Sequence, residues 1–205
     1  MYNQISTFPF KQIYAVDFEF YGDDGENPQV VCMVVQDLRT GDISRYWRDQ
    51  LLEMKTPPFI TGGDTLILTF FASAEIQSML ALKWPTNVSV IDLFTEFRCA
   101  TNGNPDVGRK GLINALAYYQ LDYLIPEQKD AMRALILSGG PWSEDQKQAI
   151  LDYCTEDVVA LAPLLDAMLS SQPWTELRLN QAQLRGRYMK AVGMMHYTGI
   201  PIDKG

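Results

Sequence analysis

Two carboxylates two positions apart, Asp17 and Glu19, interrupt an otherwise apolar segment near the N-terminus, residues 13–20, which reads IYAVDFEF. Its β-branched and aromatic residues predict a buried strand. Because successive side chains of a strand point to opposite faces, both acids should lie on one face, with Phe18 and Phe20 on the other. Two like charges side by side in a core are costly unless a cation lies between them. The pair is therefore a candidate site for a divalent metal ion.

Neither this pair nor a second candidate pair is specific by itself. An acidic chain contains Asp-x-Glu by chance, and a second copy at residues 24–26 lies in a predicted turn, where carboxylates are merely solvated. Tyr153 and Asp157 lie four residues apart in a strongly helical segment, so they share one face of the helix. Tyr118 and Asp122 repeat that spacing. A half-buried tyrosine and a surface aspartate would also explain the Tyr153–Asp157 pair, without any catalytic function.

The elements that must position these residues follow from hydrophobic periodicity and from turn and capping signals. Five strands are predicted, at residues 12–20, 29–37, 41–48, 64–70 and 88–91. Helices are predicted after a cap at Ser73, at residues 92–98, 112–119 and 127–137, from a capping box at Ser143 and Gln146 to about residue 169, and from Pro173 onward. Three strands, then strand–helix–strand, then helices predict an α/β fold with a mixed five-stranded sheet flanked by helices.

The order of the acidic residues and Tyr153 resembles that of the DnaQ-like (DEDD) 3′–5′ exonuclease superfamily, in its tyrosine branch. The sequence is most similar to the proofreading domain of bacteriophage-type family A DNA polymerases. Residues 16–19, VDFE, are similar to the first motif of that family, and residues 153–158, YCTEDV, to its third. The middle motif usually reads His-Asn-Ala-x-Phe before an acid. Residues 70–75, FFASAE, keep only the alanine and the acid, which is Glu75.

This resemblance covers roughly residues 10–170 and implies a ribonuclease H-like α/β fold. Residues 1–170 would form the exonuclease domain. Residues 171–205 would form a last helix and the start of a connection to a polymerase domain. A free-standing exonuclease is the alternative to a domain of a longer polymerase.

The resemblance also implies two divalent metal ions, Mg²⁺ or Mn²⁺, which suit all-oxygen ligands without Cys or His. Asp17 would bridge both ions, with Glu19 and Asp157 completing the first site. Glu75 would act on the second ion through water. Tyr153 would orient the attacking water, because a hydroxyl with an ordinary pKa of about 10 is a poor base at neutral pH.

The expected substrate is a single-stranded DNA 3′ end, from which mononucleotides would be released. Phe20 and Tyr21 are candidates for stacking on the terminal bases. Arg109 and Lys110 are candidates for phosphate contacts from a polar loop, although a solvated loop would also explain them. Phe18, on the far face of the first strand, is expected to pack in the core.

Composition narrows the classes of function. The net charge of −8 argues against broad electrostatic adhesion to nucleic acid, but not against an enzyme that holds a short strand. The single histidine, His196, leaves little room for a histidine base or a multi-histidine zinc site. Three cysteines without metal-binding spacing predict buried thiols in a reducing compartment. Without a recognisable membrane segment or leader, we expect a protein of the cytoplasm of a bacterial or phage-infected cell.

Two further features have a structural interpretation. Asp92 directly precedes a predicted helix and is expected to cap it. The last helix carries an apolar stripe, which is expected to pack on the domain or on a partner beyond it. The stripe consists of Leu177, Leu184, Tyr188, Val192 and Met195.

Two alternative functions remain open, and the sequence argues against a third. A related RNA-trimming exonuclease would use the same metal chemistry, which does not distinguish the two sugars. The altered middle motif slightly favours a non-catalytic nucleic-acid-binding or scaffolding domain, but the four acids in order and Tyr153 argue against it. A nucleotide-binding regulator would need a Gly-rich phosphate loop, which the sequence lacks.

Overall fold

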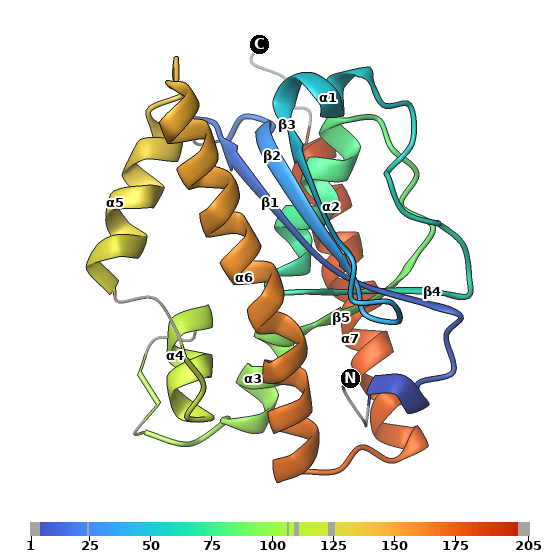
Figure 1. Cartoon of the computed structure of the whole chain (residues 1–205). Helices are drawn as coiled ribbons and strands as arrows, with labels where there is room; N and C mark the ends of the chain where they lie inside the picture. The colour runs from blue at the N-terminus through green and yellow to red at the C-terminus, as the bar shows by residue number, and fades with distance from the viewer. Residues whose placement is uncertain (1–4, 24, 106, 109–110, 123–125, 201–205) are drawn as a thin grey trace.

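The structure, a computed structural model, describes residues 5–23, 25–105, 107–108, 111–122 and 126–200. Within these residues the strands form one five-stranded sheet in the order β3-β2-β1-β4-β5 (Figure 1). The strands are β1 (Gln12–Tyr21), β2 (Gln29–Asp37), β3 (Ile43–Trp47), β4 (Thr65–Thr69) and β5 (Ser89–Asp92). β2 runs antiparallel to β1 and β3, whereas β1, β4 and β5 run parallel. The mixed sheet predicted from the sequence is confirmed, and the strand with the two acids lies at its centre.

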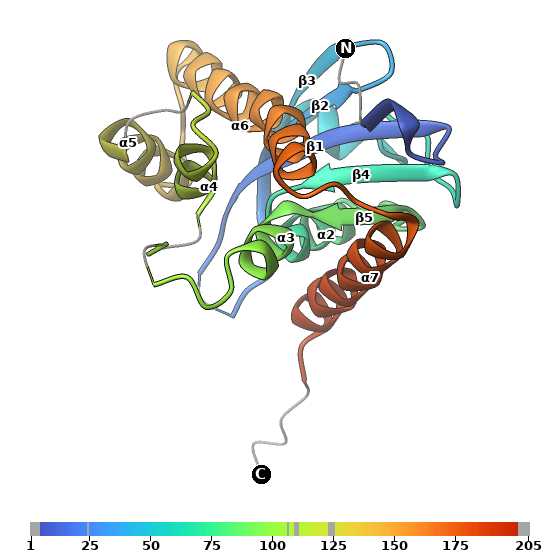
Figure 2. The same ribbon diagram turned by 90° about the horizontal axis from the view of Figure 1, so that it is seen from below.

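Helices cover both faces of this sheet (Figures 1 and 2). They are the 3₁₀ helix η1 (Ile5–Thr7), α1 (Arg48–Glu53), α2 (Ala72–Ala81), α3 (Leu93–Ala100), α4 (Leu112–Tyr118), α5 (Pro126–Leu137), α6 (Glu144–Ser171) and α7 (Glu176–Thr198). α6 crosses one face and α2 packs on the other, while α7 lies alongside β5 and α2. Of the helices in the described ranges, none combines the length and the apolar character needed to cross a bilayer.

The alternation of β1 distributes its side chains between two cores. Ile13 and Ala15 belong to the core beneath α6, whereas Phe18 packs in the core beneath α2, as the sequence predicts. Because side chains on a strand repeat their direction every two residues, Asp17 and Glu19 continue the face of Ile13 and Ala15. Both acids are therefore directed toward the α6 side of the sheet.

The start of α6 is fixed by the predicted capping box. The Oγ atom of Ser143 accepts a hydrogen bond from the N–H of Gln146 at 3.2 Å, and the Gln146 side chain accepts one from the N–H of Ser143 at 2.9 Å. This arrangement satisfies two N–H groups that the first turn of the helix leaves free. From this cap α6 continues for 28 residues and brings Tyr153 and Asp157 to the sheet beside β1.

The start of α2 differs from the prediction. Ser73 does not cap this helix but lies buried inside it, and the N-cap residue is Phe71. Phe71 has φ 85° and ψ 57°, a left-handed conformation that side-chain-bearing residues rarely adopt. Its N–H donates to the buried carboxylate of Asp92 at 2.8 Å. A contact between distant segments therefore decides where this helix begins.

Most of the apolar stripe predicted on the last helix does not pack on the domain, whereas its packing on a partner stays a prediction. Leu177, Leu184, Tyr188 and Met195 are all exposed. The helix also begins later than predicted, at Glu176 rather than Pro173, with Thr175 as its N-cap.

The buried face of α7 instead carries small residues, because the helix lies very close to its neighbours. A Cβ atom added at Gly186 would lie 1.9 Å from the carbonyl oxygen of Val90 in β5. One added at Gly193 would lie 2.7 Å from the carbonyl oxygen of Ser73 in α2. These two glycines allow the backbone of α7 to reach β5 and α2.

The close approach at Gly186 predicts that Gly186→Ala destabilises the protein. The forced shift of α7 should cost about 1–3 kcal/mol, more than the gain of about 1 kcal/mol that alanine gives a helix. Urea denaturation followed by circular dichroism measures this loss. Arg187→Ala, at the exposed neighbouring position, should stay within about 0.5 kcal/mol of wild type. A Gly186→Ala protein as stable as the Arg187→Ala control would contradict the direct packing of α7 on β5.

Candidate active site

A cleft of about 600 Å³ opens between β1, the start of α2, α4, α5 and α6. It is lined by all five residues that the sequence predicts as catalytic: Asp17, Glu19, Glu75, Tyr153 and Asp157. These residues come from three elements that are far apart in the chain. The fold therefore brings the predicted acids to one cavity, while the function of each acid there stays a prediction.

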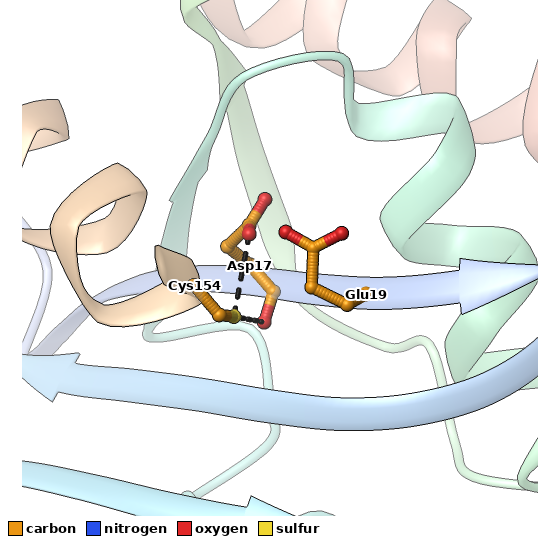
Figure 3. A group of neighbouring side chains, drawn as sticks. All are labelled: Asp17, Glu19 and Cys154. Carbon is orange, nitrogen blue, oxygen red and sulfur yellow. Dashed lines mark hydrogen bonds between the residues drawn. The ribbon is translucent and has the colours of Figure 1, made fainter. Parts of the chain in front are cut away.

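Asp17 and Glu19 extend from β1 to the same side, and Cys154 approaches them from α6 (Figure 3). One oxygen of each carboxylate and the Cys154 sulfur all lie within 4.8 Å of one another. The Sγ atom of Cys154 lies 3.4 Å from Oδ2 of Asp17 and 3.5 Å from its backbone oxygen. Burial raises the pKa of the Cys154 thiol, so the sulfur keeps its proton and donates to Asp17. Sequence analysis missed this contact, because Cys154 reads as an ordinary core residue.

Glu75 joins this group from the other side of β1. Its Oε2 atom accepts a hydrogen bond from the backbone N–H of Phe18 at 3.0 Å, and its side chain is buried. This bond ties the first turn of α2 to the strand that carries Asp17 and Glu19. Glu75 therefore lies at the cleft, although most of the middle motif, residues 70–75, differs from the usual pattern.

The electrostatics of these acids reflect their crowding. Burial, followed by the charge of Asp157, raises the pKa of Asp17 to about 7, against the opposing effects of Cys154 and Lys129. Burial and the charge of Asp17 raise the pKa of Glu19 well above its ordinary value. Burial and both of these neighbours do the same for Glu75. The site therefore holds more negative charge than its own cations neutralise.

Lys129 of α5 is a cation that pairs with one of these acids. Its Nζ atom donates to both oxygens of Asp157, at 2.7 and 3.0 Å, and lies 5.2 Å from the centre of the Tyr153 ring. Sequence analysis missed Lys129. The sequence offered one signal: Lys129 and Arg133 lie four residues apart and so share one face of a predicted helix. In the structure both residues line the cleft.

Tyr153 is buried beside Asp157. Burial raises the pKa of its hydroxyl, and the charges of Asp157 and Glu19 raise it further. The hydroxyl therefore stays protonated at neutral pH. This state suits a group that orients a water molecule and excludes a general base at neutral pH.

The predicted substrate-binding residues have different positions. Phe20 lines the cleft, and a β-bulge between Glu19 and Phe20 means that simple alternation does not fix the direction of the Phe20 side chain. Tyr21 does not line it: the ring packs against Trp142, and the hydroxyl bonds to Gln29 and Arg48. The geometry thus gives the stacking prediction for Tyr21 no support.

The other two predicted substrate-binding residues, Arg109 and Lys110, lie outside the described residues. The cleft wall contains two candidates that sequence analysis did not identify, Phe71 and Arg133. Phe71 is 43% exposed. Phe71 therefore offers an aromatic surface at the mouth of the cleft.

Asp92 has the structural role that the sequence predicts. It is fully buried and caps α3, accepting hydrogen bonds from the N–H of Phe94 at 3.2 Å and the hydroxyl of Thr95 at 2.8 Å. It also accepts the N–H of Phe71 at 2.8 Å. These donors satisfy its carboxylate within the fold.

The donor set of the cleft fits hard divalent cations. Asp17, Glu19 and Asp157 offer carboxylate oxygens, which suit Mg²⁺ and Mn²⁺. Cys154 keeps its proton and does not add a soft ligand. The crowded acids therefore form a site that a divalent cation would stabilise.

Comparisons with known proteins find a similar fold in solved structures of nucleases. No family model and no curated protein matches the sequence. Among solved structures, Trypanosoma brucei RNase D in complex with RNA U12 has a TM-score of 0.66 at 14% identity, over 100% of this chain and 68% of that one. Brucella melitensis NrnC bound to pGG has 0.59 at 16% identity, over 91% and 85%, and NrnC with bound Mg²⁺ has 0.56 at 15%, over 91% and 86%. At these identities the likeness establishes the ribonuclease H-like fold.

The raised pKa of Asp17 predicts a stability that falls as pH rises in the absence of metal. Between its ordinary value of 3.8 and its folded value of about 7, the folded state holds a proton that the unfolded chain releases. The free energy of unfolding in EDTA should therefore decrease from about pH 4 to pH 7, and Asp17→Asn should flatten this slope. Urea denaturation across this pH range measures both. Asp152→Asn, at an exposed position, is the control and should keep the wild-type dependence of the unfolding free energy on pH. The same pH dependence in Asp17→Asn would contradict the raised pKa of Asp17.

The ion pair of Lys129 and Asp157 predicts a role for Lys129 in the metal-free protein. The two side chains are 25% and 18% exposed, so Lys129→Met should cost about 1–3 kcal/mol in EDTA, between the values for exposed and buried pairs. Added Mn²⁺ should stabilise this variant more than wild type, because the ion supplies the missing positive charge. Thermal denaturation measures both effects. Lys147→Met, which removes an exposed pair with Glu144, is the control, and an equal response of the two variants would refute this role.

Proposed function

We propose that this protein is a metal-dependent 3′–5′ exonuclease of the proofreading type. It hydrolyses phosphodiester bonds at single-stranded DNA 3′ ends and releases mononucleotides. The observation that carries the proposal is the convergence of Asp17, Glu19, Glu75 and Asp157, with Tyr153, on one cleft. The nucleases of similar fold support the same class of reaction.

The metal ions are Mg²⁺ or Mn²⁺, and the Mg²⁺ in the NrnC structure supports this choice. Asp17, Glu19 and Asp157 would hold the ions, and Glu75 would act on one of them through water. Bound there, two such ions supply charge neutralisation at phosphorus and an acidified water. The cluster of buried acids with raised pKa values supports this assignment, because it is costly without cations.

The remaining residues of the cleft bind and orient the substrate. Tyr153, which stays protonated, donates a hydrogen bond that orients the attacking water. Lys129 and Arg133 supply positive charge for the phosphates. Phe20 and Phe71 provide apolar surface for the terminal base.

An exoribonuclease is the second candidate. The observation that favours it is the similarity of fold to RNase D in complex with RNA U12. The metal chemistry is the same for both substrates, so the sugar must be distinguished by contacts outside the acid cluster. The connection to a polymerase domain after the last helix, and the cytoplasmic location, remain predictions.

Digestion of 5′-labelled DNA and RNA oligonucleotides, with Mg²⁺, Mn²⁺ or EDTA, tests the proposal. We expect stepwise shortening from the 3′ end that requires metal. Asp17→Ala should slow it by about 10³-fold or more, because metal contacts contribute several kcal/mol to such a reaction. Asp152→Asn, on the exposed side of the same α6 that carries Asp157, should match wild type.

The outcomes of this assay separate the candidates. Undiminished digestion by Asp17→Ala would mean that these acids are not the site. Digestion of RNA but not DNA would replace the first candidate with the second. A protein that binds Mn²⁺ and both oligonucleotides but cuts neither would be the non-catalytic binding domain.

A further inference from the structure

A second groove adjoins the cleft on the side of α3 and α7. It has a volume of about 780 Å³ and is lined by Phe71 together with residues of the two helices, among them Phe94, Arg98 and Tyr188. Phe71 lines both the cleft and this groove. The two hollows therefore adjoin at one exposed aromatic residue.

The groove combines aromatic rings with positive charge. The rings of Phe71 and Phe94 meet edge to face at 5.0 Å between centroids, and the Arg98 guanidinium lies 5.4 Å from the centre of Phe94. Tyr188 of α7 is 67% exposed on the opposite wall. Exposed aromatic rings beside arginine are the chemistry that stacks on unpaired bases and contacts the phosphates between them.

The charge of the groove differs from that of the whole protein. The chain has a net charge of −8, yet the described residues that line the groove include Arg98 and Arg185 and no carboxylate. Arg185 is paired with the buried Glu96. Among the residues that the structure describes, Arg98 has no carboxylate within ion-pair distance, so its charge is available to a ligand. A polyanion is the partner that this local charge fits.

The backbone of Phe71 is a further sign of a ligand. Its left-handed conformation, with φ 85°, is strained for a residue with a side chain and is held by the bond from its N–H to Asp92. Such strain is concentrated at functional sites. Here it holds an exposed ring at the point where the cleft meets the groove.

We infer that the groove formed by Phe71, Phe94, Arg98 and Tyr188 binds the single-stranded nucleic acid upstream of the 3′ nucleotide held in the cleft. The inference rests on the proposed function for the position of the 3′ end. It adds that the substrate is a strand of several nucleotides rather than a dinucleotide. The exposed apolar residues of α7 beside the groove would serve the same strand.

Substrate length separates the groove from the cleft. The test compares kcat/KM for a dinucleotide and a 12-mer of the sugar type that the enzyme digests. Arg98→Glu and Tyr188→Ala should each lower kcat/KM for the 12-mer by about 10-fold, the size expected for one stacked base or charged contact. Neither variant should change kcat/KM for the dinucleotide. Tyr188→Phe should behave as wild type, because it keeps the stacking ring.

Arg187→Glu is the matched control, since it makes the same charge change on α7 at an exposed position outside the groove. A 12-mer effect in Arg187→Glu equal to that in Arg98→Glu would reduce the result to net charge and overturn the inference. Unchanged 12-mer kinetics in Arg98→Glu and Tyr188→Ala would also overturn it. A change in oligomeric state on sedimentation without any change in 12-mer kinetics would assign the groove to a protein partner instead.

Failure of the proposed function gives a different result. If the wild-type protein cuts neither substrate, the exonuclease proposal fails, and fluorescence anisotropy of a labelled 12-mer decides the groove alone. The groove stays a strand-binding site if Arg98→Glu and Tyr188→Ala each reduce the affinity for the 12-mer about 10-fold and Arg187→Glu does not. Equal affinity of wild type and all three variants for the 12-mer would show that the groove does not bind the strand.

Discussion

The arrangement depends on one electrostatic constraint, the burial of several carboxylates within reach of one another. Asp17 and Glu19 lie side by side on the central strand, and Glu75 is buried against the same strand. Burial and mutual repulsion raise the pKa of all three. Such a cluster lowers stability at neutral pH, so it has no value to a fold that only needs to be stable. A divalent cation bound at this site, as we propose, would offset that cost.

The fold compensates this charge only in part, and each contribution comes from a different element. Lys129 on α5 pairs with Asp157, and the Cys154 thiol on α6 donates to Asp17. The backbone of β1 donates to Glu75 through the N–H of Phe18. Full neutralisation by fixed cations would make the acids useless as metal ligands, because it would remove the attraction for an ion. Partial compensation keeps the protein folded and leaves that attraction in place.

Sequence reasoning succeeded where neighbouring residues decide the structure. The alternation of β1 and the capping box of α6 depend on spacing within one segment, and both were predicted. It failed where a distant contact decides. Ser73 is a good cap by residue type, but Asp92, 21 residues beyond Phe71, fixes the start of α2 instead. Lys129 was recognisable as a helical cation, but its pairing with Asp157 depends on how α5 packs against α6. The small residues of α7, not its apolar stripe, face the sheet, because close contacts with β5 and α2 decide which side of the helix is buried.

Asp92 shows why the burial of an acid does not by itself indicate catalysis. It is more deeply buried than Asp17 and Glu19, which are half-buried, and burial raises its pKa as well. It accepts hydrogen bonds from two backbone N–H groups and from Thr95, so its charge is satisfied inside the fold. Asp17 and Glu19 lie against each other, with the Cys154 thiol and the charge of Lys129 as partial compensation. The number of donors around a carboxylate, rather than its depth, therefore separates an acid that stabilises the fold from one that is available to a metal ion.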